Sequence, residues 1–176
     1  NQVDGTNGQI EVYANWEAVG YRLPTEAEWE KAARGGLSGK RFPWGNEINH
    51  DYANYTANGN AFSYDTSPYV TNTFHQTYDD GGAVRTSPVG SFDPNGYGLY
   101  DMAGNVLEWC WDWYGTPYAV GTDSRGPSSG ANRVLRGGHW GDDAFAARCA
   151  YRKDYDPGER RSISIGFRSV LPSGQP

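Results

Sequence analysis

The sequence predicts an α+β domain that is rich in loops and contains a small twisted antiparallel sheet. Hydrophobic residues make up only 37% of the 176-residue chain, while aromatic residues reach 15% and glycine occurs 24 times. This composition is typical of a loop-rich domain whose core depends on a few large rings. A single strong helix signal and several short strand-like segments, separated by glycine and proline, complete the pattern. The length suits one domain.

The predicted helix follows Thr25. Thr25 and Glu28 stand three residues apart, which is the pattern of a capping box. Acidic residues fill the first turn and basic residues the last, and Gly35 follows as a stop signal. Trp29 lies on the apolar face of this helix and is expected to pack inward.

Short strands are predicted around this helix. The weakly alternating residues 9–13 are the first of these segments. Residues 132–140 form a strand that ends in a tight glycine turn, and residues 148–152 and 163–170 form two more. Short strands connected by loops are expected to pair as a small sheet.

Residues 96–114 combine turn residues, oxygen ligands and large aromatic side chains. Gly96 and Gly98 accommodate backbone conformations with positive φ. Asp101, Asn105 and Glu108 follow within eight residues. Calcium takes about six to eight oxygen ligands, and backbone carbonyls supply part of such a set. The spacing is equally consistent with a plain turn that binds no metal.

Trp109, Trp111 and Trp113 alternate at the end of this stretch. Alternate residues of a strand lie on the same face. We expect this face to point inward, so that the indole rings anchor the core.

The polar residues 46–84 show no lasting periodicity. A long stretch without regular elements is unusual inside a compact domain unless something holds it in place. Asn54 and the pair Asp79 and Asp80 are candidate oxygen ligands for a second cation. The alternative is a surface loop with solvated carboxylates.

Composition also narrows the classes of partner. The net charge of −6 argues against nucleic acid or an anionic membrane surface. No apolar run approaches the about 20 residues of a membrane span. Cys110 and Cys149 allow one bridge at most, or two buried thiols. The chain starts at Asn1 without a visible signal peptide, so the sequence assigns no compartment.

Six motifs, in order from about Gly20 to Val170, resemble the formylglycine-generating enzyme (sulfatase-modifying factor) family. They are Arg22-Leu-Pro-Thr-Glu-Ala-Glu-Trp-Glu, Phe42-Pro-Trp-Gly, Pro88-Val-Gly-Ser-Phe, Asn95-Gly-Tyr-Gly-Leu-Tyr-Asp-Met-Ala-Gly-Asn-Val-Leu-Glu-Trp, Arg133-Val-Leu-Arg-Gly-Gly and Gly166-Phe-Arg. The resemblance implies that family's variant of the C-type lectin fold over residues 20–176. Residues 1–19 are then a tail, or the remnant of a longer N-terminal segment that members of the family carry.

The resemblance also implies structural calcium. The family's first site corresponds here to Asn54, the carbonyl of Tyr55 and either Asp79 or Asp80. Its second site corresponds to two carboxylates and three carbonyls, those of Asp101, Glu108, Met102, Gly104 and Val106.

The chain departs from the enzymes of the family where they bind copper. In those enzymes two cysteines follow the Gly-Gly turn and hold copper for oxidation of a substrate cysteine. Here the first position falls on Asp142 and the second lies near Ala147. Copper(I) requires soft thiolate ligands, so we expect neither copper nor this oxidase chemistry. The three histidines are scattered, and no nucleophile elbow or phosphate-binding loop occurs.

The C-terminal stretch mixes aromatic and charged side chains on predicted loops, which is the composition of a recognition surface. The candidate ligand-binding residues are His139, Trp140, Asp142, Asp143, Phe145, Tyr151, Lys153, Tyr155, Glu159 and Arg161. This stretch resembles the variable region of proteins that are diversified by retroelements and reuse this fold.

The leading hypothesis is therefore a non-catalytic module that binds a protein or another macromolecule through this surface. A merely solvated face, a structural subunit of a larger assembly, and an oxidoreductase-type enzyme with altered chemistry are the alternatives.

Overall fold

The computed structural model describes residues 2–3, 10–11, 15–16, 20–118, 121–122, 124–159 and 162–171. It contains one helix, α1 (Glu26–Arg34), within these ranges. Its strands are β1 (Gln2–Val3), β2 (Ile10–Glu11), β3 (Leu107–Trp113), β4 (Arg133–Arg136), β5 (Lys153–Tyr155) and β6 (Ile165–Gly166). In the described residues no helix has both the length and the apolar character needed to cross a membrane.

The helix has the capped ends that its sequence predicts. The Glu28 N–H donates to the Thr25 hydroxyl at 3.2 Å, and the Thr25 N–H donates to the Glu28 carboxylate at 2.8 Å. Gly35 ends the helix with a φ of 53°, and its N–H donates to the Ala32 carbonyl. These bonds satisfy backbone groups that a helix leaves unpaired at its ends.

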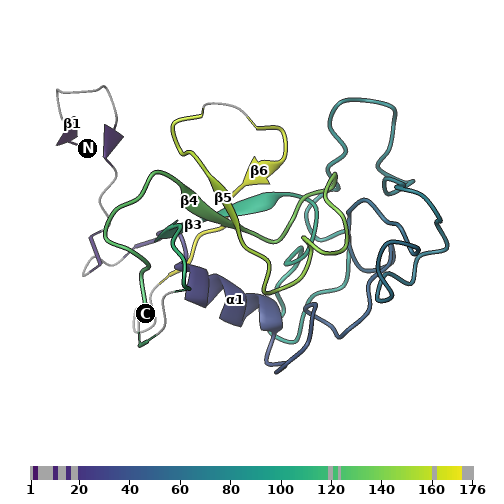
Figure 1. Cartoon of the computed structure of the whole chain (residues 1–176), viewed down its shortest axis with the longest axis horizontal. Coiled ribbons are helices and arrows are strands. Elements are labelled where there is room, and N and C mark those ends of the chain that lie inside the picture. The colour runs from purple at the N-terminus through teal and green to yellow at the C-terminus, as the bar shows by residue number, and fades with distance from the viewer. Residues whose placement is uncertain are drawn as a thin grey trace.

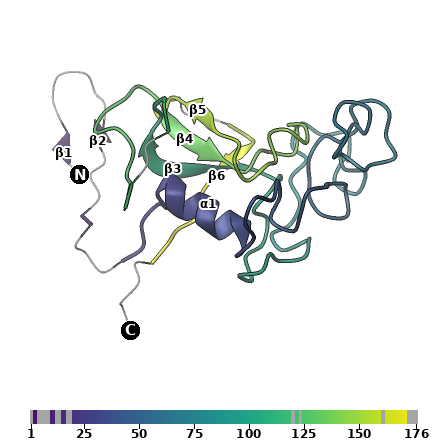
Figure 2. The same ribbon diagram turned by 60° about the horizontal axis from the view of Figure 1, so that its bottom comes forward.

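Four strands form the main sheet in the order β5-β4-β3-β6. The β3–β4 and β4–β5 pairs are antiparallel, whereas β6 pairs with β3 in parallel. Figures 1 and 2 show α1 lying across one face of this sheet. Strands β1 and β2 pair in a separate two-stranded sheet, and β2 falls within the strand predicted over 9–13.

The three tryptophans of β3 face the opposite way from the prediction. The fully buried side chains of this strand are Leu107, Glu108, Cys110 and Asp112, while all three tryptophans are half-buried. The prediction that the indole rings anchor the core is therefore wrong. Instead, the Arg133 guanidinium packs 3.6 Å from the centroid of Trp113 on the outer face.

The inner face of β3 is polar because it holds the helix. The Glu108 carboxylate accepts from the Trp29 indole N–H at 2.6 Å. The Asp112 carboxylate accepts from the Glu26 N–H, at the helix N-terminus, at 2.7 Å. A buried carboxylate requires such partners, and these partners are on α1.

The strands near the C-terminus are shorter and start later than predicted. Residues 148–152 form a turn, closed by the Tyr151 N–H donating to the Arg148 carbonyl at 3.0 Å. The strand follows at β5, within residues that the sequence assigns to a loop. Of the strand predicted over 163–170, only β6 pairs with the sheet, and Val170 forms an isolated bridge with Arg22.

The long polar segment has a small core of its own. Phe42, Ile48 and Tyr55 are buried together, with Tyr64 packed against them. The Tyr55 hydroxyl donates to the Asp65 carboxylate at 2.8 Å. In Figure 1 these loops gather at one end of the molecule, beyond the C-terminal end of α1. Ring packing and hydrogen bonds thus order a segment that lacks helices and strands.

Candidate functional site

The predicted ligand-binding residues form three adjoining groups, and the first surrounds Asp142. The His139 Nε2 atom lies 3.3 Å and the Lys153 Nζ atom 4.0 Å from the Asp142 Oδ1 atom. The Asp142 N–H donates to the His139 carbonyl at 2.9 Å, which closes a turn directly after β4. Burial lowers the pKa of His139, and Lys153 contributes in the same direction.

The second group is aromatic. The rings of Phe145 and Tyr151 meet edge to face with 5.7 Å between centroids. Phe62 stacks on Phe145 at 6.2 Å, and the Arg148 guanidinium lies 3.6 Å from the Phe145 centroid. The Asp143 carboxylate accepts from the Phe145 N–H at 3.0 Å and holds the local turn. Phe145 nevertheless keeps 43% of its surface exposed.

The third group lies on and beyond β5. The Tyr155 hydroxyl donates to the Glu159 carboxylate at 2.6 Å, and this bond raises the pKa of Tyr155. The Trp109 ring contacts Tyr155 with 6.2 Å between centroids. Side chains alternate along a strand, so Lys153 and Tyr155 project on the same side of β5. This strand therefore connects the first group to the third.

Trp140 and Arg161 differ from the other eight candidates. Trp140 is only 8% exposed and packs against Phe74, with 5.8 Å between centroids, beneath the surface. Trp140 therefore supports the exposed residues from below. Arg161 lies outside the described residues.

Small buried residues alternate with the exposed candidates. Ala144, Ala147 and Cys149 are buried between Asp143, Phe145 and Tyr151. Gly138 precedes this stretch with a φ of 73°, and a Cβ atom there would lie 2.9 Å from the Ala146 carbonyl oxygen. The turn therefore requires glycine. The exposed side chains stand on a closely packed base.

The contacts of Phe62 with Phe145 and of Trp109 with Tyr155 were not predicted from the sequence. Phe62 comes from the distant loop segment, and no local motif connects it to Phe145. Trp109 does carry a signal, because it alternates along a strand that is predicted to be paired. The contact of Trp109 with Tyr155 was missed because this face of the strand was predicted to point inward.

The positions that hold copper in the enzymes provide different chemistry here. Asp142 is engaged with His139 and Lys153, and Ala147 is buried. Cys110 and Cys149 are both free thiols and both buried, so they are not bridged. Burial raises the pKa of Cys149 to about 11 and that of Cys110 well above its usual value. At neutral pH both sulfurs are protonated, whereas metal binding requires thiolates.

The first predicted calcium set has one open acceptor. Asn54 is buried, and its Oδ1 atom has no hydrogen-bond partner among the described residues. Its amide N–H donates to the Arg85 carbonyl at 2.7 Å, which leaves the oxygen available. The Tyr55 carbonyl lies 3.0 Å from the His50 Nε2 atom. Asp79 pairs with Arg85 at 2.5 Å, and the Asp80 carboxylate accepts from the Gly82 N–H at 2.8 Å.

The second predicted calcium set is partly satisfied by the protein itself. The Asp101 Oδ1 atom is buried without a partner in the described part of the chain, while its Oδ2 atom accepts from the Gly90 N–H at 2.8 Å. Glu108 forms a two-point ion pair with Arg168, at 2.5 and 2.6 Å, and also accepts from Trp29.

The prediction also includes the carbonyls of Met102, Gly104 and Val106 in the second calcium set. A Cβ atom at Gly104, where φ is 76°, would lie 2.3 Å from the Asn54 carbonyl oxygen. The Asn105 N–H donates to that same carbonyl at 2.7 Å, so the two predicted loops are in direct contact.

No cluster of three or more His, Cys, Asp or Glu side chains that could hold a metal occurs in the described part of the chain. The open Asn54 and Asp101 oxygens do fit a hard cation that draws its other ligands from carbonyls. In the second loop the Arg168 guanidinium already neutralises Glu108.

Comparison with known proteins identifies the family. The "Sulfatase-modifying factor enzyme 1-like domain" matches residues 8–172. The chain is 47% identical over 132 residues to the formylglycine-generating enzyme of Thermomonospora curvata, covering 72% of this chain and 40% of that enzyme. It is 44% identical over 161 residues to serine/threonine-protein kinase pkn1 of Chlamydia caviae, covering 89% of this chain and 21% of that protein.

Among solved structures, Treponema denticola variable protein 1 superposes with a TM-score of 0.66 and 37% sequence identity, covering 88% of this chain and 49% of that one. The chain thus spans about half, or less, of the length of these relatives. The predicted formylglycine-generating-enzyme fold, a small mainly antiparallel sheet with one helix, is confirmed by the structure and by this match. The chain belongs to the sulfatase-modifying factor enzyme 1-like domain family.

Proposed function

We propose that this domain is a non-catalytic ligand-binding module whose binding surface comprises His139, Asp142, Asp143, Phe145, Tyr151, Lys153, Tyr155 and Glu159, hereafter the ligand surface. The observation that carries the proposal is the alternation between buried small residues and aromatic or charged side chains that are exposed or half-buried. Aromatic rings offer large contact area at low entropic cost, and the charged groups around them add specificity. We expect the ligand to be a protein or another macromolecule.

We further propose that the ligand surface varies between copies of the gene, as in proteins diversified by retroelements. The likeness to Treponema denticola variable protein 1 supports this idea. Exposed side chains that stand on a packed base can change without loss of the fold, because surface substitutions usually alter stability by about 0.5 kcal/mol or less.

The residues at the copper positions support a non-catalytic role. A carboxylate that pairs with Lys153 and a buried alanine replace the two thiolates that copper(I) needs. Oxygen uptake by the copper-treated domain with a cysteine-containing peptide is the relevant assay. We expect none above buffer, and turnover of the peptide would overturn the proposal.

We also propose that calcium stabilises the loops of residues 46–106, hereafter the loop lobe. Asn54 and the Tyr55 carbonyl, with Asp79 or Asp80, would hold one ion. Another would be held by Asp101, by Glu108, which also pairs with Arg168, and by the carbonyls of Met102, Gly104 and Val106. The support is the pair of buried acceptors that lack partners among the described residues. A bound cation would coordinate the buried oxygen in each set and stabilise the loop that contributes it.

A display experiment tests the binding role with a model target, because the ligand itself is unidentified. One yeast-displayed library randomises Asp143, Phe145, Tyr151, Lys153, Tyr155 and Glu159. A matched library randomises six buried positions, namely Leu107, Val134, Leu135, Ala144, Ala147 and Cys149. Both libraries are sorted for display of folded protein and then for binding to fluorescent streptavidin.

We expect most clones of the surface library to fold and some to bind streptavidin, with binding lost when the selected residue at 151 or 155 is changed to alanine. The buried library should mostly fail to fold. The proposal is contradicted if the surface library fails to fold as often as the buried library, or if it yields no binder.

A further inference from the structure

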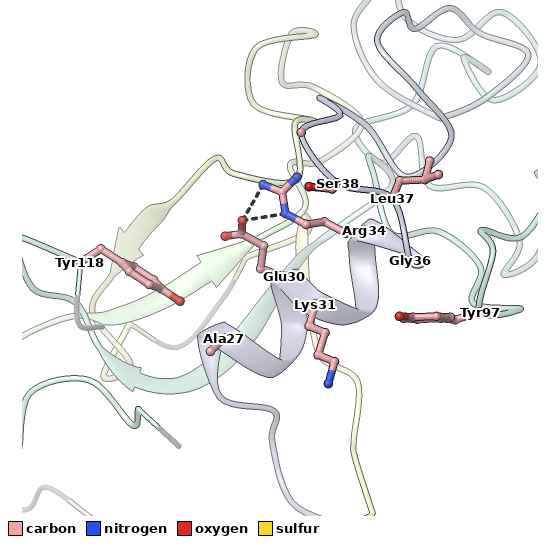
Figure 3. Close-up of a pocket in the computed structure, with 10 residues that line it drawn as sticks. Ala27, Glu30, Lys31, Arg34, Gly36, Leu37, Ser38, Tyr97 and Tyr118 are labelled. Carbon is pink, nitrogen blue, oxygen red and sulfur yellow. Dashed lines mark hydrogen bonds and ion pairs between the residues drawn. The ribbon is translucent and has the colours of Figure 1, made fainter. Parts of the chain in front are cut away.

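A groove runs along the side of α1 that carries Ala27, Lys31 and Arg34, and none of the residues of the ligand surface line it. Its volume is about 570 Å³, within the range of about 300–1,000 Å³ that ligand sites occupy. Figure 3 shows Ala27 and Lys31 of the helix in its wall, with Tyr118 beside the first turn and Tyr97 beside the helix end.

The two tyrosines present exposed rings at opposite ends of this groove. Tyr97 is 54% exposed and Tyr118 is 37% exposed. A Cβ atom at Gly36 would lie 3.5 Å from the Tyr97 ring, so that ring is supported by the backbone at the helix end. The Arg152 guanidinium lies 5.1 Å from the centroid of Tyr118 and supports it from the other end. Both rings are therefore held in place while part of each remains open.

The spacing between the two ends suits a short extended chain. From Ala27 to Arg34, which both line the groove, the helix rises about 10 Å, at about 1.5 Å per residue. A polyproline II segment advances about 3.1 Å per residue, so about four residues span this distance. Extended segments of this kind bind grooves with aromatic walls.

The charges in the groove leave one cation without a partner. Glu30 and Arg34 pair at 2.6 Å, and Glu30 also contacts the buried Arg136 at 2.5 Å. The remaining Arg34 nitrogen donates to the Lys40 carbonyl at 3.0 Å. Among the described residues, nothing forms a hydrogen bond or ion pair with the Lys31 ammonium group. In Figure 3 it extends away from the Glu30–Arg34 pair, between the two tyrosine ends.

We propose that this groove binds an extended peptide segment of about four residues, in which a central carboxylate pairs with Lys31 and flanking proline or aromatic residues pack on Tyr97 and Tyr118. The partner is an acidic peptide because Lys31 is the only lining charge that the described part of the protein does not neutralise. A nucleic acid is disfavoured by the net charge of −6. This site is separate from the ligand surface and does not depend on it.

Fluorescence anisotropy with labelled peptide pools tests the proposal on the whole chain. Three pentapeptide pools carry proline, tyrosine, phenylalanine or leucine at the flanking positions. The central residue is glutamate in the first pool, glutamine in the second and lysine in the third. We expect the glutamate pool to bind at least tenfold more tightly than the glutamine pool, and the lysine pool to bind most weakly.

Single substitutions test whether the peptides bind in this groove. Lys31→Glu should reduce binding of the glutamate pool at least tenfold, whereas Lys40→Glu, an equal charge change at another exposed lysine, should leave it unchanged. Tyr97→Ala and Tyr118→Ala should each weaken it. Equal binding of the three pools, no detectable binding, or indifference to Lys31→Glu would overturn the proposal. A loss caused by Tyr151→Ala, on the ligand surface, would overturn it too.

Discussion

Arginine side chains neutralise several buried carboxylates of this domain. Arg136 is fully buried and contacts Glu26 at 3.5 Å and Glu30 at 2.5 Å. Arg152 binds Glu26 through two bonds of 2.6 and 2.8 Å. Such pairs are costly to break, because the remaining charge stays buried without a partner. Single residues therefore control how α1 is attached to the sheet.

The pair between Arg168 and Glu108 offers a test of how much such an ion pair stabilises the fold. Arg168→Met would leave Glu108 buried with only the Trp29 indole as a side-chain partner among the described residues. We expect a loss of about 3 kcal/mol in the free energy of unfolding, measured by urea denaturation. The double variant Arg168→Met/Glu108→Gln should recover part of that loss. A single variant as stable as the wild type would show that this ion pair does not stabilise the loop.

Asp112 has no arginine partner in the described part of the chain, and its burial should make stability depend on pH. Burial raises its pKa to about 6, above the value of about 3.9 in an unfolded chain. The folded state therefore binds the proton more tightly, and its stability falls as pH rises from about 4 to about 6. Asp112→Asn keeps an oxygen that can accept from the Glu26 N–H and removes the titration.

Urea unfolding of the wild type and Asp112→Asn at pH 4.5 and pH 7 measures this effect. The variant should gain stability relative to the wild type as pH rises. The same difference between the two proteins at both pH values would contradict the assignment.

At the scale of elements, the helix was predictable because its signals are local. Thr25, Glu28 and Gly35 lie within or next to the segment that they cap, so adjacent residues contain the information. The sheet was less predictable, because the inward face of β3 depends on contacts with Trp29 and Glu26, which are distant in sequence. For the same reason β5 begins after the strand predicted over 148–152.

The same difference between local signals and contacts distant in sequence applies to the ligand surface. All of its members come from residues 139–159 and were predicted from composition. The contact of Phe62 with Phe145 was not predicted, because only the folded chain brings the two rings together. Burial also distinguishes Trp140 from its neighbours, which sequence alone did not show.

The close contact at the end of α1 is tested by Gly35→Ala. Gly35 has a φ of 53°, and an added Cβ atom would lie 2.8 Å from the Gly96 nitrogen. Both the left-handed backbone and the crowding disfavour alanine, so we expect a loss of more than about 1 kcal/mol. Gly39→Ala, at a φ of 67° with open space around it, is the matched control and should cost less. Equal urea midpoints for the two variants would contradict the importance of this contact.

The melting temperature tests the calcium proposal for both predicted sites at once. Calcium added after chelation should raise the melting temperature, because the buried oxygens of Asn54 and Asp101 would gain a cation partner. Asp101→Ala should reduce that increment, whereas Asp93→Ala, at an exposed position, should not. Equal melting temperatures with calcium and with chelator would contradict the proposal.

At the scale of the whole molecule, the helix, the sheet and the loop lobe support one surface. The base of the ligand surface connects to all three. Cys149 lies in one buried cluster with Trp29 and Ala33 of α1. The Thr56 N–H donates to the Asp142 carbonyl at 2.8 Å. β5 pairs with β4 in the sheet. A surface held from several sides can change its exposed side chains while the backbone beneath keeps its course.

Sequencing the 3′ part of the gene in many clones, with its flanking DNA, tests this central claim most directly. We predict substitutions concentrated in the codons of the ligand surface, with the codons of buried neighbours such as Ala144, Ala147 and Cys149 unchanged, beside a near-copy template. Substitutions spread evenly over exposed and buried codons, or a single fixed sequence without a template, would contradict a variable ligand-binding surface.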